Sequence, residues 1–511
     1  MTSEMSSGVT EDSDRPRRHR SRRTSGHPAR RGVLMAAGTV LALVGSLGAA
    51  VAAPAVGQRS APTDAPSNRG AALTPNGFWR MDGYGMVVGV RDGVLRAWET
   101  TAISCQSSLT AQQQGTPGAD GSVRYGTDGL ILTVRPKAAR HATLSIDGSV
   151  GIRGLRRITA LPALCGQPQE SGPVATFDVF WQTFKENYAF FDRRGVDWDA
   201  VRAQYRPKVH AGTTPSELFD ILSAMTAPLQ DAHVSLAAET PELTRMSRTI
   251  RDGTVGPTQE YDDQIRAFIE RRDLGGTPLQ DYAQGAIGYA DLPGGIGYLR
   301  INRFVAYSPD GGYDNDSAEL DRALDQIITQ ARTTGRTAWR GLIVDVRVNA
   351  GGSDGLGQQI AARLTDRAYT AYAKQARNDP QDDTRFTPRQ KLRVVPAAGS
   401  PRYTGPVALL IGGSTVSAGE TFTMALAERP SATTLIGENT QGILSDVHGR
   451  TLPNGWQLGL SNEKYTTPGG VSYEGPGIAP DLRTPVFTAE ELAADRDSAF
   501  DRAKAVLTRR R

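Results

Sequence analysis

Val407-Ala408-Leu409-Leu410-Ile411-Gly412-Gly413 leads directly into Ser414-Thr415-Val416-Ser417-Ala418-Gly419-Glu420. The apolar run predicts a buried strand, and the glycine pair that follows predicts its end. We expect a helix over 418–427, so Ser417 would lie at the positive end of the helix dipole. Free backbone N–H groups at such a position stabilise an alkoxide or an oxyanion. The same residues also fit a Ser-x-x-Glu capping box, and Ser414 is a competing serine on the same turn.

Strands and helices alternate on either side of this stretch. From residue 287 onward, further strands are predicted over 296–301, 342–347 and 434–436, and further helices over 318–331 and 355–364. This alternation indicates an α/β core that contains a substantial parallel sheet.

A candidate base for a serine nucleophile lies in Leu229-Gln230-Asp231-Ala232-His233, which holds one of six histidines. It follows an amphipathic helix that begins with a capping box at Thr214. A serine hydroxyl needs an adjacent base, and histidine titrates near neutral pH. A histidine taken alone is more often structural, and His210 and His448 are further histidines of the region.

Two other turns combine glycine with polar side chains. In 345–352, Asp-Val-Arg-Val-Asn-Ala-Gly-Gly, a strand runs into glycines whose N–H groups can face a developing negative charge. An ordinary strand-to-helix turn with a structural Asp345–Arg347 pair is the alternative. In 472–481, Glu474 lies in a turn rich in glycine and proline, where its carboxylate could orient an imidazolium. A solvated loop acid is the alternative there.

The order of these motifs resembles a known family. Leu-x-Asp-x-His, Asp-x-Arg-x-Asn-x-Gly-Gly, Ser-Ala-Gly-Glu, Gly-Glu-x-Thr-x-Gly (437–442) and Glu-Gly-x-Gly-Ile-x-Pro-Asp resemble the C-terminal processing (tail-specific) serine peptidases over about residues 170–490. One branch of that family uses a Ser–Lys dyad, and Ile443 stands at its lysine position. The chain is therefore more similar to the tricorn-core and retinoid-binding-protein-like branch, whose base is the histidine of Asp-x-His.

The resemblance implies a crotonase-like (ββα spiral) peptidase core, with no cofactor and no metal. The serine that precedes the catalytic histidine in the tricorn core is replaced by Ala232 here. The implied site consists of a nucleophile, Ser417; a base, His233; an orienting acid, Glu474; and an oxyanion hole of backbone N–H groups from Gly351 or Gly352 and from Ala418.

Charge is concentrated at the N-terminus. The formal net charge is +4, and residues 1–52 carry eight arginines against four acids, so the remainder is close to neutral and predicts no nucleic-acid partner. Arg30-Arg31, an apolar run to about residue 53 and the small-x-small site Ala50-Val51-Ala52 predict an export signal. The protein is then exported, extracellular or at the cell surface. An uncleaved N-terminal membrane anchor is the alternative.

Residues 76–166 predict a small antiparallel β domain, because short alternating runs are separated by Asp-Gly pairs. Cys105 and Cys165 are the only cysteines, and in an exported protein they predict one disulfide. The other predicted segments are a flexible linker (53–75), a helical segment that carries His233 (172–236), a polar connecting segment (237–285), the α/β serine peptidase core (286–490) and a C-terminal helix or tail (491–511).

Together these features favour an exported serine-type endopeptidase that hydrolyses polypeptides through an acyl-enzyme. A non-catalytic ligand- or peptide-binding protein on the same fold is the main alternative. A third reading is a structural cell-surface protein whose β domain binds a partner. Transient association with a membrane or cell wall stays open, and the sequence does not indicate an oligomeric state.

Overall fold

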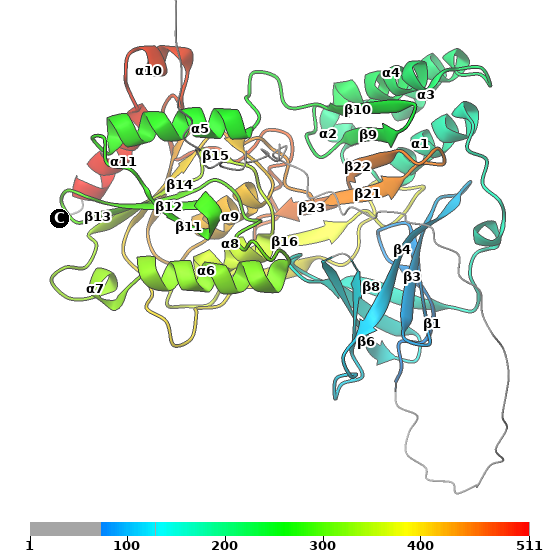
Figure 1. Cartoon of the computed structure of the whole chain (residues 1–511), viewed down its shortest axis with the longest axis horizontal. Coiled ribbons are helices and arrows are strands. Elements are labelled where there is room, and N and C mark those ends of the chain that lie inside the picture. Colours follow the sequence, from blue (N-terminus) through cyan, green and yellow to red (C-terminus); the bar gives the residue numbers. More distant parts are fainter. Residues whose placement is uncertain (1–72, 128, 510–511) are drawn as a thin grey trace, which may run out of the picture. The chain divides into compact units, whose positions relative to one another are not determined.

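The computed structural model describes residues 73–127 and 129–509 (Figure 1). The predicted export signal at 1–52 and most of the linker at 53–75 lie outside these residues. Within the described ranges, no helix has both the length and the apolar character needed to cross a bilayer.

An eight-stranded antiparallel barrel forms the first part of the described chain. Pairing of β1 with β8, for example Trp79 with Arg157, closes it. Its interior is filled by buried apolar side chains, among them Trp79, Leu95 and Val134. A disulfide joins Cys105, at the start of β4, to Cys165 in the short helix η1 (Ala163–Gly166). The barrel strands are β1 (Gly77–Met81), β2 (Met86–Arg91), β3 (Val94–Thr100), β4 (Cys105–Gln114), β5 (Val123–Thr127), β6 (Leu130–Ala138), β7 (His141–Ile146) and β8 (Arg153–Ile158).

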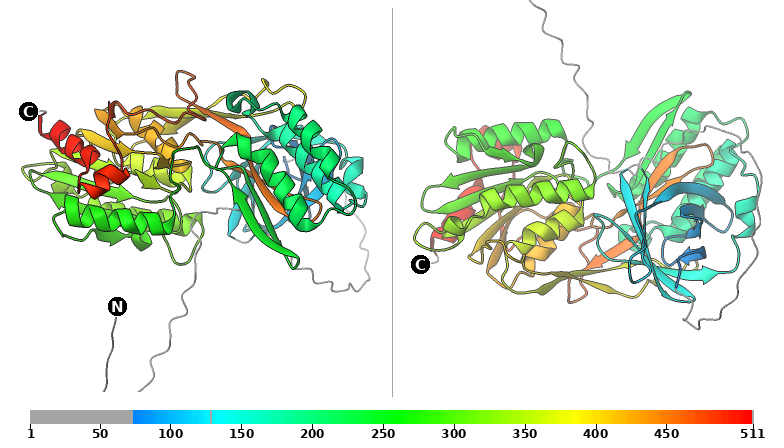
Figure 2. Two further views of the ribbon diagram at one scale, coloured as in Figure 1. Left: turned by 90° about the horizontal axis from the view of Figure 1, so that it is seen from above. Right: turned by 60° about the horizontal axis from the view of Figure 1, so that its bottom comes forward.

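A helical layer follows and packs on a four-stranded sheet of order β10-β9-β22-β21. Phe177, Phe180 and Phe184 of α1 are fully buried against this sheet, which explains the aromatic spacing of that helix. In Figure 2 these helices (teal) lie beside the barrel strands (blue to cyan). The helices are α1 (Pro173–Asn187), α2 (Phe191–Arg194), α3 (Trp198–Tyr205) and α4 (Pro215–Thr226), and the strands are β9 (Ser235–Thr240), β10 (Leu243–Arg248), β21 (Val447–Thr451) and β22 (Gln457–Ser461).

This sheet is built from two distant parts of the chain. Strand β9 comes directly after His233, and its Leu236 pairs with Leu458 of β22. The segment 237–285, predicted as a polar connection, therefore begins within a sheet and continues into the hairpin strand β10 and the helix α5 (Gln259–Phe268).

The second part of the molecule is centred on a seven-stranded sheet of order β11-β12-β13-β14-β18-β20-β24. The strands from β13 to β24 are parallel, and β11 and β12 add antiparallel to one edge. Two predicted strands, 296–301 and 407–411, coincide with β13 and β18. The strands are β11 (Gln280–Tyr282), β12 (Ile287–Leu292), β13 (Ile296–Ile301), β14 (Gly341–Asp345), β18 (Val407–Ile411), β20 (Thr433–Gly437) and β24 (Leu482–Arg483).

Helices cover both faces of this sheet (Figure 1). Val344 and Leu409 pack in the core under α6 (Tyr313–Ile327), α8 (Asp354–Ala362) and α9 (Ala418–Ala427). Ile343 and Leu410 pack in the opposite core, under α5 and α11 (Ser498–Arg509). Burial on both faces is why these strands read as continuous apolar runs.

Short strands connect this core to the barrel. Strands β17 (Gln390–Val394), β16 (Tyr369–Ala376) and β23 (Glu463–Thr466) form a sheet that runs from α9 toward the barrel in Figures 1 and 2. Ala376, at the end of β16, packs in the barrel interior. Strands β15 (Val348–Asn349) and β19 (Ser414–Thr415) pair in parallel, and the remaining helices are α7 (Gln330–Thr333) and α10 (Ala489–Ala493).

Candidate active site

Ser417 lies between β19 and α9 in a strained backbone conformation, with φ 54° and ψ −120°. Residues other than glycine rarely adopt a positive φ, and such strain is concentrated at functional sites. A sharp strand-to-helix turn of this kind exposes a serine hydroxyl ahead of a helix N-terminus. The competing Ser414 differs, because its hydroxyl is buried and donates to the carbonyl oxygen of Val255 at 2.5 Å.

Glu420 holds the turn in place from inside the protein. Its carboxylate accepts hydrogen bonds from four donors, the backbone N–H groups of Ser417 (3.3 Å), Gly442 (2.7 Å) and Ile443 (2.8 Å) and the Thr440 hydroxyl (2.6 Å). Burial raises the pKa of Glu420 to about 7, and these four hydrogen bonds oppose that rise. The predicted capping box therefore forms, and its glutamate also fixes the turn at 440–443.

The glycine pair after β15 packs directly against Ser417. A Cβ atom on Gly351 would lie 2.7 Å from the Ser417 Cβ and 3.3 Å from the Ala418 nitrogen. The N–H of Gly351 is already used, because it donates to Asn349 Oδ1 at 2.9 Å. Among the described residues, the N–H groups of Gly352 and Ala418 have no acceptor. Of the two glycines that the sequence offers, Gly352 is therefore the one with a donor left for an oxyanion.

His233 is buried, with 7% of its surface exposed, and lies between α4 and β9. Its backbone N–H donates to Asp231 Oδ1 at 2.9 Å, and its Nδ1 atom is buried with no hydrogen-bond partner in the described ranges. Burial lowers the pKa of the imidazole, and Arg248 lowers it further, whereas Asp231, Asp446 and the Ser445 backbone raise it. The neutral form, which can accept a proton, is therefore favoured near neutral pH.

A small apolar cluster brings the two predicted residues into neighbouring backbone segments. Ala232 precedes His233, Val416 precedes Ser417, and both pack with Ile443. Within the described chain no hydrogen bond joins the His233 and Ser417 side chains.

Glu474 is fully buried, so it is not a solvated loop acid. Its Oε2 accepts from the Leu444 N–H at 2.9 Å, and its Oε1 lies 3.7 Å from Arg194 Nη2 without a hydrogen bond. Arg194 Nη2 also lies 4.0 Å from Asp231 Oδ2, which accepts from the Tyr188 hydroxyl at 3.0 Å. Burial and then the nearby Asp231 charge raise the pKa of Glu474 well above its usual value. The two carboxyl groups thus share one arginine.

The lysines near these segments are unsuited to act as the base. Lys374 Nζ lies 3.1 Å from both carboxylate oxygens of Glu463 and 3.3 Å from Asp446 Oδ2. Burial favours the neutral amine, but the two carboxylates outweigh it and raise the Lys374 pKa. Lys464 instead lies over the Phe386 ring, 5.5 Å from its centroid. Sequence reasoning missed this Lys374–Asp446–Glu463 group, because its members are distant in the chain and match no local motif.

In the described part of the chain, no group of three or more His, Cys, Asp or Glu side chains is arranged to hold a metal ion.

Comparison with known proteins finds two segments of the chain that match peptidase family models. Residues 295–484 match the family model "Peptidase family S41", and residues 175–227 match "Tricorn protease C1 domain". Over these segments the chain is similar to the C-terminal processing peptidase family, whose members are serine peptidases. The tricorn match covers helices α1–α4, the helical segment that leads to His233.

Individual relatives are distant. The chain is 25% identical over 252 residues to the chloroplastic carboxyl-terminal-processing peptidase 1 of Arabidopsis thaliana, a match that covers 49% of this chain and 44% of that protein. It is 29% identical over 192 residues to a carboxy-terminal-processing protease of Bartonella bacilliformis, covering 37% and 39% respectively. The matches therefore span less than half the length of these curated relatives.

A solved structure supports the fold more broadly. The crystal structure of a candidate peptidase from Parabacteroides merdae ATCC 43184 superposes with a TM-score of 0.54 at 26% identity. The match covers 66% of this chain and 97% of that one. The chain thus shares the mixed α/β architecture of that structure, and residues 295–484 resemble the S41 peptidases.

Proposed function

We propose that this protein is an exported serine-type endopeptidase, with Ser417 as nucleophile on a crotonase-like (ββα spiral) core over residues 286–490. One observation carries the proposal. Ser417 occupies a strained turn at a helix N-terminus, flanked by the N–H groups of Ala418 and Gly352, which have no acceptor in the described chain. Strain and free donors together are what a preorganised oxyanion site requires.

The proposed reaction is acyl transfer to water. His233 takes the proton of the Ser417 hydroxyl as Oγ attacks the peptide carbonyl, and the N–H groups of Gly352 and Ala418 receive the oxyanion. The imidazolium then gives that proton to the leaving amine, and the C–N bond breaks to leave an acyl-enzyme. Water attacks the ester with His233 again as base, and the proton returns to Ser417 as the peptide acid leaves.

In this scheme Glu474 orients the imidazole through the backbone. Its carboxyl group accepts from the Leu444 N–H, and the next residue, Ser445, presents its backbone to the His233 ring. Asp231 supports the other side of His233 by accepting its backbone N–H. Arg194 lies between the two acids and balances their charge.

The test uses two serine variants of the same turn. Ser417→Ala should lose both peptide hydrolysis and labelling by a fluorophosphonate probe, since that probe reacts with an activated serine. Ser414→Ala is the matched control and should keep both, because the Ser414 hydroxyl is bonded to Val255. Undiminished hydrolysis by Ser417→Ala would rule out the assignment.

A non-catalytic binding protein on the same fold is the second candidate. The observation that favours it is the absence, within the described residues, of a hydrogen bond between the His233 and Ser417 side chains. A binding protein would show saturable peptide binding with no covalent labelling of the wild-type chain. Labelling that disappears with Ser417→Ala would exclude it.

Export rests on the sequence of residues 1–52 alone. Expression with this segment should place the protein outside the cytoplasm, and mass spectrometry of the mature chain should find a new N-terminus near Ala52. An intact N-terminus in the membrane fraction would instead indicate an anchor.

A further inference from the structure

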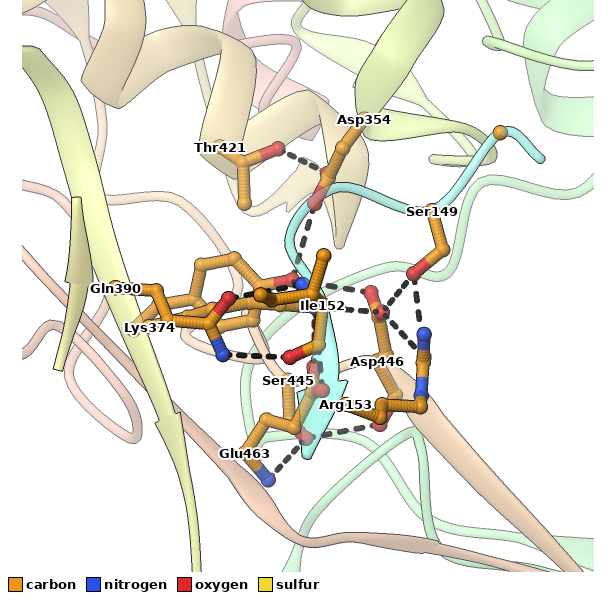
Figure 3. Close-up of polar contacts among 12 residues, drawn as sticks. Ser149, Ile152, Arg153, Asp354, Lys374, Gln390, Thr421, Ser445, Asp446 and Glu463 are labelled. Atoms are coloured by element: carbon orange, nitrogen blue, oxygen red, sulfur yellow. Dashed lines mark hydrogen bonds and ion pairs between the residues drawn. The ribbon is translucent and has the colours of Figure 1, made fainter. Parts of the chain in front are cut away.

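A buried polar cluster joins residues of the barrel to residues of the peptidase core (Figure 3). Lys374 on β16 is 2% exposed and pairs with both Glu463 and Asp446. Asp446 Oδ2 also accepts from the Ser149 hydroxyl at 3.0 Å, and it lies 3.9 Å from Arg153 Nη2. Ser149 and Arg153 belong to the barrel, between β7 and the start of β8, so Asp446 is one residue of the core that contacts the barrel.

The second carboxylate oxygen of Asp446 lies near the Tyr465 hydroxyl, which is also close to the carboxyl group of Asp354. Tyr465 Oη lies 3.2 Å from Asp446 Oδ1 and 3.0 Å from Asp354 Oδ2. One hydroxyl proton can satisfy only one carboxylate, so both contacts are favourable only if one acid carries a proton. Burial and then the Asp446 charge raise the pKa of Asp354 to about 7. Burial also opposes ionisation of Asp446, but Lys374 and Arg153 outweigh it and lower the Asp446 pKa. Of the two acids, Asp354 is therefore the one that more readily holds a proton.

The cluster reaches each part of the proposed site. Asp354 is the first residue of α8, two residues after Gly352, and it accepts a hydrogen bond from Thr421, one turn beyond Ser417 on α9. Ser445, adjacent to Asp446, presents its backbone to the His233 ring. The Ser445 hydroxyl donates to the Asp446 carbonyl at 2.8 Å and accepts from the Glu463 N–H at 3.1 Å.

The barrel also contacts the glycine turn directly. The Ser353 hydroxyl donates to the carbonyl of Gly148 at 2.7 Å. On the other side of the barrel loop, Gln390 exchanges two hydrogen bonds with the Ile152 backbone, at 2.7 and 2.8 Å. The loop 148–153 is therefore held on both sides by residues of the peptidase core.

We propose that Asp446 is a positioning residue: by joining barrel loop 148–153 to Lys374 and Tyr465, it holds the Ser445 backbone against the His233 imidazole. The inference rests on the proposed function of His233 as base. It makes the barrel a structural part of the active centre. The Asp446 carboxylate also favours the imidazolium form of His233, because opposite charges attract across this buried region.

Asp446→Asn tests this role with little change in shape. The variant removes the charge that binds Lys374 and Arg153, so the 444–446 segment should lose its fixed position. We expect kcat to fall by about 100-fold with little change in KM, since a small misplacement of a catalytic group has that cost. The acid limb of the kcat/KM profile should also move to lower pH. A merely structural residue would not produce this pH shift.

Glu99→Gln is the matched control. Glu99 is another buried acid between barrel and core, accepting from the Ser108 hydroxyl at 2.8 Å and the Thr451 N–H at 2.7 Å. It has no hydrogen bond to the cluster, so kcat and the pH profile should match wild type. Unchanged kcat and pH profile in Asp446→Asn would overturn the proposal.

Two further measurements keep the test decisive. Ser149→Ala removes the 3.0 Å hydrogen bond from the barrel to Asp446, together with the 3.3 Å hydrogen bond that Ser149 accepts from Arg153. It should lower kcat about fivefold even if Asp446→Asn does not fold. NMR titration of 13C-labelled His233 in the Ser417→Ala background needs no activity. Asp446→Asn should lower the His233 pKa in that background. If Asp446→Asn does not fold, Ser149→Ala should alter the His233 pKa instead. If neither variant alters the titration, the inference fails, whereas an active Ser417→Ala enzyme would defeat only the proposed function.

Discussion

The backbone N–H of Ser417 donates to the carbonyl oxygen of Ile443 at 3.2 Å. The residue at the position where the Ser–Lys branch of the family has its base thus touches the backbone of the proposed nucleophile. Its side chain packs with Ala232 and Val416 and carries no titratable group. The structure places an apolar contact at this position, so the base of the proposed mechanism would come from another segment.

Replacing this contact offers a direct test. In a His233→Ala background, Ile443→Lys should regain part of the fluorophosphonate labelling, because an amine in an apolar environment loses its proton readily. Ile443→Met in the same background has similar length and no amine. Equal labelling rates for the lysine and methionine variants would contradict the prediction.

Gly351→Ala should strongly reduce activity. The new Cβ would lie 2.7 Å from the Ser417 Cβ, and the φ of 77° is unfavourable for alanine. We expect a loss in kcat/KM of about 100-fold or more, because the serine must shift. Gly335→Ala is the control: its φ is 81°, but no atom lies within 4 Å of the added Cβ. It should cost ~1–2 kcal/mol of stability, measured by urea unfolding, and leave kcat/KM intact.

The pH profile should report the buried histidine. Because burial lowers the pKa of His233, the acid limb of kcat/KM should lie below 6.5, the usual value of the residue. Arg248 lowers this pKa as well, so Arg248→Gln should move the limb to higher pH. The measurement is the pH dependence of kcat/KM for wild type and Arg248→Gln at equal ionic strength. A shift to lower pH in the variant would be inconsistent with this arrangement.

Asp354 should make stability depend on pH. Its pKa is raised to about 7 in the folded protein, so between about pH 4 and 7 the folded state binds the extra proton. Stability from this group is therefore complete at low pH and declines as the pH rises toward 7. Asp354→Asn cannot ionise, and relative to wild type it should gain about 1 kcal/mol or more between pH 5 and pH 8. Urea unfolding of both proteins at the two pH values measures this difference.

Removal of the disulfide should weaken the barrel. Cys105 and Cys165 are 60 residues apart in sequence, and the chain-entropy model gives about 4 kcal/mol for closing such a loop. A Cys105→Ala, Cys165→Ala double variant should unfold at lower urea. An unchanged midpoint would show that the crosslink adds no stability.

Local signals in the sequence were enough to predict much of the α/β core. The strands 296–301 and 407–411 and the helix 418–427 agree with β13, β18 and α9, because apolar runs, glycine pairs and capping residues act over short distances. Closure of the barrel by β1 and β8 could not be read in this way, since no local pattern records which strands pair.

In the candidate site, too, local sequence patterns predict individual residues but not the contacts between distant ones. Ser417 and His233 stood out because residue type and motif are visible in the sequence. The choice of Gly352 over Gly351 depends on the Asn349 side chain, which occupies one N–H. The Lys374–Asp446 pair depends on three-dimensional contact between β16 and a loop far along the chain. Neither follows from residue spacing.

The pairing of β9 with β22 has a consequence for how the protein is made. During synthesis His233 emerges well before Leu458, the partner of Leu236. Glu474 follows later still. Until then the segment that carries the candidate base lacks one neighbouring strand. A chain that lacks β22 and Glu474 would therefore have no assembled candidate site.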